Sequence, residues 1–227
     1  MKLIASGCSF TDANYNNTTW KKWPDLIEGN WDEVINIACS GANNQYLLND
    51  LIKTIYLEKD IDTIVIGLTN WLRYQVPDDS RSVNFRMVQE APHKINDWKT
   101  IEIEKLYPTT FDVAEKRMDF CLMQLLTIAN MCIEKNIKLH AFQMIAMSHN
   151  GWPEKYLLKS PYFSMLDQLH EDNKIDLMNW PWNIKGCVDY ELGPKESIFR
   201  IGTWDLHPSA LGQQFIADWF MENHKDI

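Results

Sequence analysis

A continuous run of aliphatic residues at Asp62–Leu68 (Asp-Thr-Ile-Val-Ile-Gly-Leu) constrains the fold more than any other feature of this sequence. A strand that is apolar on both faces must be covered on both faces, which is typical of a parallel sheet with helices on either side. The segment from Asn44 to about Glu58 precedes this strand and repeats its leucines and isoleucines at three- and four-residue steps, which predicts a helix. This order of helix and strand predicts an α/β protein.

The rest of the chain continues the same alternation. Further strands are predicted at Lys2–Ser6, Glu33–Cys39 and Ile137–Ile145, and further helices at Phe111–Asn136 and from Pro208 to about Asn223. Parallel strands joined by helices form right-handed crossovers, so the helices should lie on both faces of the sheet. We therefore predict a three-layer α/β/α sandwich with a flavodoxin-like parallel sheet of about five strands.

Two stretches do not follow this pattern. Residues from about 74 to 110 and from about 148 to 203 are rich in Pro, Trp, Asn and charge, and we expect irregular insertions there. The chain has no internal repeat and no obvious linker. A single domain over residues 1–227 is the prediction that follows.

Composition excludes several classes of function. The formal net charge of −9 argues against nucleic-acid binding, which normally needs a basic face. The sequence has no apolar run of about 18 residues, so we expect no membrane span. The first apolar stretch is too short for a secretory signal, and the five cysteines show no CxxC spacing. We expect a cytoplasmic protein of bacterial or phage origin that binds no metal and no cofactor.

The segment Gly7-Cys8-Ser9-Phe10-Thr11 follows the first predicted strand directly. A serine at the carboxyl end of a parallel strand points into the crevice where such sheets place their sites. If a helix begins soon after, backbone N–H groups of the turn could face a developing oxyanion. The same small residues also suit a tight turn or a phosphate-binding turn, so the segment alone leaves the nucleophile open.

A second segment of chemical interest lies near the C-terminus. His207 directly precedes Pro208 and the last predicted helix, and Asp205 lies two residues before it. A histidine in this position can act as a general base, and a nearby aspartate can orient its ring and stabilise the imidazolium. A capping loop that happens to contain a histidine is the alternative.

Four short blocks, taken together, resemble the SGNH/GDSL hydrolases. Ser9 in Gly-Cys-Ser-Phe-Thr is similar to the Gly-Asp-Ser block that opens that family, and His207 in Asp-Leu-His-Pro is similar to its last block. Between them, Asn36–Gly41 and Gly67–Asn70 resemble the two middle blocks, and all four occur in the family's order. The resemblance implies a serine nucleophile, Ser9, and a base, His207. It also implies an oxyanion hole formed by the N–H groups of Ser9 and Gly41 and the amide of Asn70.

The sequence departs from the family's pattern at three places. Cys8 stands where the family has Asp, and Gly67 lies three residues before Asn70 instead of two, with Trp71 in place of the following Asp. In the last block the family's acid lies three residues before the histidine, where this chain has Trp204. Either Asp205 completes a triad through a differently shaped loop, or Ser9 and His207 act as a dyad.

The function predicted from these blocks is serine ester hydrolysis by acyl transfer. Trp152, Trp180 and Trp182 could stack on sugar rings, although packing beneath long loops is the interpretation that we favour. The expected substrate is a small-molecule or glycan ester, with carbohydrate O-acetyl esters as a candidate class. The residues expected to line the substrate site are Phe10, Trp71, Arg73 and Trp204.

Two alternatives remain open at this stage. The first is a catalytically degenerate member of the same fold that serves as a binding or structural module. The second is a flavodoxin-like domain that binds nucleotides or phosphate at the Gly7–Thr11 turn, although the chain has neither a GxGxxG motif nor a P-loop. The sequence does not determine the oligomeric state.

Overall fold

The computed structural model describes most of the chain. The described residues are 1–15, 18–71, 73–75, 82–84, 111–145, 156–180 and 187–224, and for 73–75, 82–84 and 111–114 only the backbone is described.

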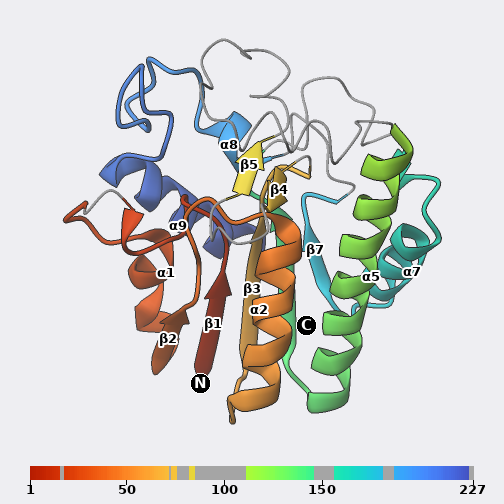
Figure 1. Ribbon diagram of the computed structural model, residues 1–227. Coiled ribbons are helices and arrows are strands. Elements are labelled where there is room, and N and C mark those ends of the chain that lie inside the picture. The colour runs from red at the N-terminus through yellow and green to blue at the C-terminus, as the bar shows by residue number, and fades with distance from the viewer. Residues whose placement is uncertain are drawn as a thin grey trace.

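The centre of the molecule is a five-stranded, all-parallel sheet (Figure 1). Its strand order is β2-β1-β3-β6-β7, and the strands are β1 (Lys2–Ser6), β2 (Glu33–Asn36), β3 (Thr63–Leu68), β6 (Lys138–Gln143) and β7 (Asp176–Met178). The order reverses at β1, whose partners are β2 on one side and β3 on the other. This is the flavodoxin-like order predicted from the sequence, and ligands in such sheets bind at the carboxyl ends of the strands beside this reversal.

Helices cover both faces of the sheet, as the apolar central strand requires. In Figure 1, α2 lies in front of the sheet and α9 lies behind it. The helices are α1 (Trp23–Leu26), η2 (Glu28–Asn30), α2 (Asn44–Leu57), α5 (Phe111–Lys135), α7 (Pro161–Glu171), α8 (Val188–Glu191) and α9 (Ala210–Asn223). A separate antiparallel pair is formed by β4 (Arg73–Gln75) and β5 (Ser82–Asn84).

Alternation along the strands divides the buried side chains into two cores. Ile64 and Ile66 of β3 pack with α2, α5 and α7 on one face. Val65 of the same strand packs with α1 and α9 on the other, where Trp23 contacts the rings of Phe142 and Phe220. Successive side chains of a strand point to opposite faces, so one continuous apolar run supplies both cores. The three-layer sandwich predicted from the sequence is confirmed.

Two boundaries differ from the sequence prediction for local reasons. Strand β2 ends at Asn36 instead of Cys39, because the Asn36 side chain accepts a hydrogen bond from the Ala38 N–H and turns the chain. Helix α9 begins at Ala210 with Ser209 as its N-cap, whose Oγ accepts from the Gly212 N–H. Pro208 therefore lies before the helix instead of in its first turn, and it pairs with Arg200 in an antiparallel bridge.

The stretch 148–203 was wrongly expected to be irregular. It contains α7 and the last sheet strand, β7, and it also contains α8. Strand β7 has only three residues, which is too short for a periodic pattern to reveal it. Within 74–110, strands β4 and β5 are described in part and the remaining residues lie outside the described chain. The single-domain division stays a prediction.

Candidate active site

Ser9 lies in a tight turn directly after β1. The N–H groups of Thr11 and Asp12 both donate to the Cys8 carbonyl, at 2.9 and 3.0 Å, so Ser9 occupies the centre of the turn. A side chain at Gly7 would approach Thr11 Oγ1 to 2.4 Å, which explains why glycine precedes the turn. Ser9 is only 5% exposed. In the described chain the next helix is α1, so the helix start expected beside Ser9 is not found there.

His207 lies on one arm of a short hairpin that precedes α9. The Ile201 N–H donates to the His207 carbonyl at 2.9 Å, and Gly202 and Asp205 exchange backbone hydrogen bonds at 3.1 and 3.2 Å to form the turn. Asp205 and His207 are two residues apart on the same arm. Side chains at i and i+2 of an extended segment point to the same side, so this hairpin places the carboxylate beside the imidazole.

The three predicted catalytic side chains form a continuous hydrogen-bonded line. Ser9 Oγ lies 2.8 Å from His207 Nε2, and His207 Nδ1 lies 2.6 Å from Asp205 Oδ1. The His207 backbone N–H also donates to Asp205 Oδ1, at 3.1 Å. With the ring proton on Nδ1 and directed at the carboxylate, Nε2 is an acceptor for the serine proton. This arrangement can move a proton from the serine hydroxyl to the imidazole.

The electrostatics of Asp205 favour its ionised form. Partial burial by itself raises the pKa of the carboxyl group, but hydrogen bonds from the His207 backbone and ring and from the Tyr15 hydroxyl outweigh that effect. The pKa of Asp205 therefore lies below its ordinary value of 3.8. An ionised carboxylate at this position can stabilise a positive charge on His207.

Tyr15 and Phe10 surround the imidazole of His207. The Tyr15 ring stacks on it with centroids 3.9 Å apart, and the Phe10 ring meets it edge-on at 5.3 Å. The Tyr15 hydroxyl lies 2.7 Å from His207 Nδ1 and 3.4 Å from both carboxylate oxygens of Asp205. No sequence pattern distinguishes Tyr15 from the other tyrosines, so the sequence analysis missed it.

The second predicted block is tied to the serine turn by three contacts. The Cys39 N–H donates to the Gly7 carbonyl at 3.0 Å, and the Asn36 amide donates to the Thr11 carbonyl at 2.7 Å. Asp12 is buried, and its Oδ2 accepts from both the N–H and the hydroxyl of Ser40, at 2.8 and 2.5 Å. Asp12 therefore fixes the segment that carries the predicted oxyanion donor, in addition to bonding its own turn through the Asn14 N–H at 2.8 Å.

Gly41 itself has a φ of +78°, a conformation that glycine adopts at little cost. The third block follows β3, where Asn44 Oδ1 accepts from the Thr69 N–H at 2.8 Å and Asn44 Nδ2 donates to the Thr69 carbonyl at 3.1 Å. Asn70 comes directly after this anchored residue and is half-buried. Ser9, Gly41 and Asn70 thus follow the carboxyl ends of three neighbouring strands, β1, β2 and β3.

The residues expected to line the substrate site have different surroundings. Trp204 is fully exposed, because it lies in the turn of the hairpin. Phe10 is buried beneath His207. Trp71 is also buried, in the core under α2 and α5, and its indole N–H donates to Gln143 Oε1 at 2.8 Å. Its expected role in lining the substrate site stays a prediction. The side chain of Arg73 lies outside the described residues.

The tryptophan cluster does not form a sugar platform in the described chain. The Trp180 ring stacks on Phe163 with centroids 4.2 Å apart, and its N–H donates to Asp167. Both contacts are to α7, so Trp180 packs against a helix. Trp152 and Trp182 lie outside the described residues.

Comparisons with solved structures identify the fold. A member of the lipolytic G-D-S-L family from Veillonella parvula matches with a TM-score of 0.51 and 11% identity, over 98% of this chain and 97% of that chain. A GDSL-like lipase from Bacteroides thetaiotaomicron matches with a TM-score of 0.50 and 14% identity, over 97% and 86%. This chain has the fold of the G-D-S-L lipolytic proteins.

The same G-D-S-L fold relates the chain to a glycan-processing enzyme. A catalytic mutant of an acetylxylan esterase from Geobacillus stearothermophilus matches with a TM-score of 0.52 and 12% identity, over 97% of this chain and 92% of that chain. No protein-family model matches the sequence, and no curated protein sequence matches it either. The likeness therefore lies in the fold.

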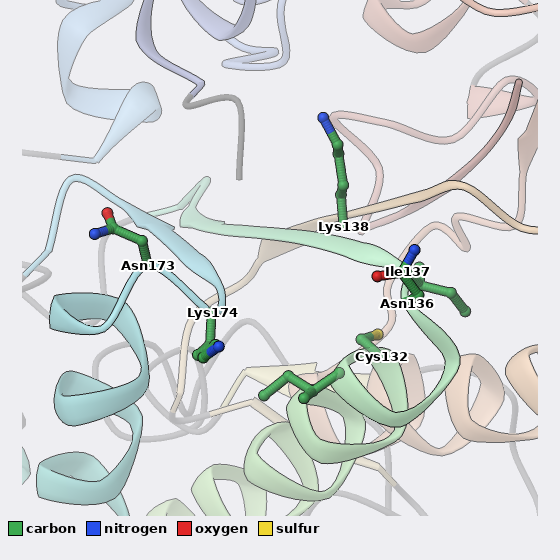
Figure 2. Close-up of a pocket in the computed structure, with 7 residues that line it drawn as sticks. Cys132, Asn136, Ile137, Lys138, Asn173 and Lys174 are labelled. Carbon is green, nitrogen blue, oxygen red and sulfur yellow. The ribbon is translucent and has the colours of Figure 1, made fainter.

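A cavity elsewhere in this G-D-S-L fold lies far from the serine turn. It has a volume of about 280 Å³ and lies where α5 ends and β6 begins, lined in part by Cys132, Asn136, Lys138 and Lys174. Figure 2 shows the side chain of Lys138 extending away from Cys132 and Lys174. Parallel strands begin at one edge of the sheet and end at the other, so this cavity is at the edge opposite Ser9.

Two kinds of feature, a membrane-spanning helix and a metal-binding cluster, are absent from the described part of the chain. Its helices include none that is both long and apolar enough to cross a bilayer. Its His, Cys, Asp and Glu side chains include no group of three placed to hold a metal ion.

Proposed function

We propose that this chain is a serine ester hydrolase and a divergent member of the SGNH/GDSL hydrolases. The observation that carries the proposal is the line of hydrogen bonds from Ser9 Oγ through His207 to Asp205, with distances of 2.8 and 2.6 Å. A nucleophile, a base and an orienting acid in hydrogen-bond contact are the minimum for acyl transfer by serine. The fold, which is that of lipolytic proteins, is compatible with this chemistry.

The acylation step uses all three side chains. Ser9 Oγ attacks the carbonyl carbon of the ester while its proton passes to His207 Nε2. Asp205 stabilises the imidazolium that forms, and the depressed pKa of this carboxyl group keeps it ionised. The bond from the carbonyl carbon to the alcohol oxygen then breaks, and His207 returns its proton to the leaving alkoxide. Ser9 is left as an acyl ester.

Deacylation reverses these roles. A water molecule gives one proton to His207 Nε2 and attacks the acyl carbon, and the bond to Ser9 Oγ breaks as the proton returns to the serine. In both steps negative charge develops on the carbonyl oxygen. The proposed donors to this charge are the N–H groups of Ser9 and Gly41 and the side-chain amide of Asn70. Losing one such donor typically costs about 3 kcal/mol of transition-state stabilisation.

The alternative of a degenerate binding module predicts a broken pair. A fold retained without catalysis has no need to keep the serine hydroxyl and the imidazole in contact, yet they lie 2.8 Å apart although 198 residues separate them in the chain. Asp205 lies two residues before the histidine instead of three, but it still contacts the His207 ring because both residues lie on the same hairpin arm. The distance therefore supports the hydrolase and gives no support to the binding module.

For the substrate we propose small acyl esters, with O-acetyl groups on carbohydrates as the first class to test. The structural neighbour that is an acetylxylan esterase motivates this choice. Trp204, which is fully exposed in the hairpin turn and adjacent to Asp205, is available to stack on a flat part of such a substrate. The proposal requires neither a metal nor a cofactor.

Replacing Ser9 by Ala tests the proposal. The substitution removes the nucleophile, and we expect turnover of aryl acetates and acetylated sugars to fall by about 10⁶-fold. Ser164→Ala, at an exposed serine of α7, is the matched control and should hydrolyse at the unmodified rate. A serine-directed phosphonate should add its mass to the Ser9 peptide of the unmodified chain. Equal turnover by Ser9→Ala and the unmodified protein would contradict the assignment of Ser9.

A further inference from the structure

Tyr15 contacts both members of the His207–Asp205 pair, although it comes from the opposite end of the chain. Its ring stacks on the imidazole at a centroid distance of 3.9 Å and an interplanar angle of 28°. Its hydroxyl lies 2.7 Å from His207 Nδ1 and 3.4 Å from each carboxylate oxygen of Asp205. A tyrosine is thus placed where it can act on the orientation of the base and on the acid at the same time.

The hairpin cannot by itself fix the histidine relative to the serine. Asp205 belongs to the same hairpin arm as His207, and its Oδ1 accepts from both the ring and the backbone N–H of that residue. These contacts move with the hairpin and leave the separation of Nε2 from Ser9 Oγ unconstrained. Arg200 holds the hairpin through the Leu206 carbonyl, and Tyr15 and Phe10 add direct contacts from the serine loop to the imidazole itself.

Tyr15 is itself anchored to the rest of the molecule. The Thr18 hydroxyl donates to the Tyr15 carbonyl at 3.1 Å, and the Lys22 ammonium donates to Thr18 Oγ1 at 2.6 Å. Lys22 is buried, and its Nζ lies 5.8 Å from the centroid of the Tyr15 ring, within cation–π range. Asp12 and Asp25 act on Lys22 electrostatically, without a side-chain hydrogen bond to its ammonium among the described residues. Tyr15 and Thr18 are therefore the partners toward which this buried cation is directed, together with the Trp20 ring at 5.5 Å.

We propose that Tyr15 is a positioning residue of the active site, with its ring fixing the imidazole of His207 toward Ser9 and its hydroxyl donating to the Asp205 carboxylate. The proposal rests on the proposed esterase function. A carboxylate is a stronger acceptor than a neutral ring nitrogen, so the tyrosine proton is directed at Asp205 and the Nδ1 proton stays on His207. This leaves Nε2 free of a proton, which is the form that can accept from Ser9.

The hydroxyl also has an effect on the acid–base balance of the pair. Among the described residues, the charged or titratable groups in contact with His207 include the Asp205 carboxylate and the Tyr15 hydroxyl, and the Lys22 ammonium lies over the tyrosine ring. A hydrogen bond donated to Asp205 and a nearby cation both reduce the electrostatic stabilisation that the carboxylate gives to the imidazolium. Removing the hydroxyl should therefore raise the pH at which His207 gains its proton, and should also loosen the ring.

Two substitutions separate the hydroxyl from the ring. Tyr15→Phe keeps the stacked ring, and we expect kcat for an aryl acetate to fall about tenfold with KM unchanged, because one charge-assisted hydrogen bond is lost. The acidic limb of the kcat/KM–pH profile should move to higher pH. Tyr15→Leu removes the stacked ring as well and should lower kcat by about 10²-fold, the usual effect of a misplaced catalytic group. Tyr56→Phe, at a tyrosine that is 81% exposed, is the matched control.

A second measurement does not depend on turnover. NMR titration of the His207 ring, assigned by its loss in His207→Gln, should show a higher midpoint in Tyr15→Phe than in the unmodified protein or in Tyr56→Phe. If Tyr15→Phe and Tyr15→Leu keep the original kcat, pH limb and His207 midpoint, the positioning role is wrong. Lower thermal stability with the original kcat, pH limb and midpoint would overturn it equally, because that result describes a structural residue only.

The failure of the esterase proposal would have a different signature. In that case the unmodified protein and Ser9→Ala would hydrolyse the acetates at the same rate. The His207 titration would still decide whether Tyr15 controls the imidazole. An active, Ser9-dependent enzyme that is indifferent to both Tyr15 substitutions would refute the Tyr15 proposal alone.

Discussion

The part of the chain that the structure describes contains two histidine–aspartate pairs in contrasting surroundings. His207 and Asp205 lie 2.6 Å apart at the carboxyl edge of the sheet, with side chains 26% and 29% exposed. His140 of β6 and Asp176 of β7 lie 3.0 Å apart inside the molecule, and each side chain is 2% exposed. The first pair contacts a serine hydroxyl, whereas the second is covered by the rings of Phe220 and His224.

The contrast shows that the pair alone does not define a site. Both pairs have the same two side chains at hydrogen-bond distance, but only the His207–Asp205 pair is partly exposed to solvent and has a serine hydroxyl at the far nitrogen. The buried pair links two neighbouring strands at positions that are directly paired in the sheet, His140 with Asp176. Its position predicts a role in stability, since a buried carboxylate needs a partner to offset its loss of hydration.

Replacing each histidine by Leu should give the largest effects. The effect should be on turnover for His207 and on stability for His140. In His207→Leu the base is lost, and we expect esterase turnover to fall by about 10⁶-fold with little change in the free energy of unfolding. His140→Leu leaves the Asp176 carboxylate buried without its ring partner, and we expect a loss of about 3 kcal/mol in stability. Urea unfolding followed by tryptophan fluorescence measures the second effect. Loss of turnover in His140→Leu molecules that remain folded would contradict the purely structural role of the His140–Asp176 pair.

Replacing each aspartate by Asn sharpens the comparison at the acid. In Asp205→Asn the amide can donate to His207 Nδ1, which would place the ring proton on Nε2 and prevent it from accepting from Ser9. We expect kcat to fall by about 10⁴-fold, as in triads held in the wrong tautomer. Asp176→Asn keeps a hydrogen bond but loses its charge assistance, so turnover should persist and stability should fall by about 1 kcal/mol. A loss of less than tenfold in Asp205→Asn would favour a Ser9–His207 dyad.

The smallest expected effect is a pH dependence of stability that arises from Asp205. The pKa of its carboxyl group is lower in the folded chain than its ordinary value of 3.8, so its ionised form favours folding. That contribution is fully present above about pH 4 to 5 and is lost as the pH falls through the folded pKa. The difference in urea midpoint between the unmodified protein and Asp205→Asn should narrow as the pH falls from 5 to 3. A difference that widens toward pH 3 would contradict the direction of the shift.

Much of the fold follows from local sequence patterns. The run at Asp62–Leu68 had to be covered on both faces, and it supplies Ile64 and Ile66 to one core and Val65 to the other. The helix predicted from Asn44 to about Glu58 is α2, Asn44–Leu57. These features are set by side-chain period and burial within a few consecutive residues, so they could be predicted. Strand β7 could not, because three residues carry no period and its place depends on pairing with β6.

The residues of the candidate site likewise fall into those that could be proposed from the sequence and those that needed the fold. Ser9 and His207 could be proposed from the sequence, because each follows or precedes an element whose type is locally determined. The choice of Asp205 as the acid needed the hairpin, whose backbone pairing places residues two apart on one side. Tyr15, Asp12 and the burial of Trp71 also needed the fold, since their contacts join segments far apart in the chain. The sequence by itself determined the layers and the choice of Ser9 and His207 as the proposed nucleophile and base. Only the tertiary structure decided which groups orient these two side chains, because orientation depends on contacts between loops and not on the period within an element.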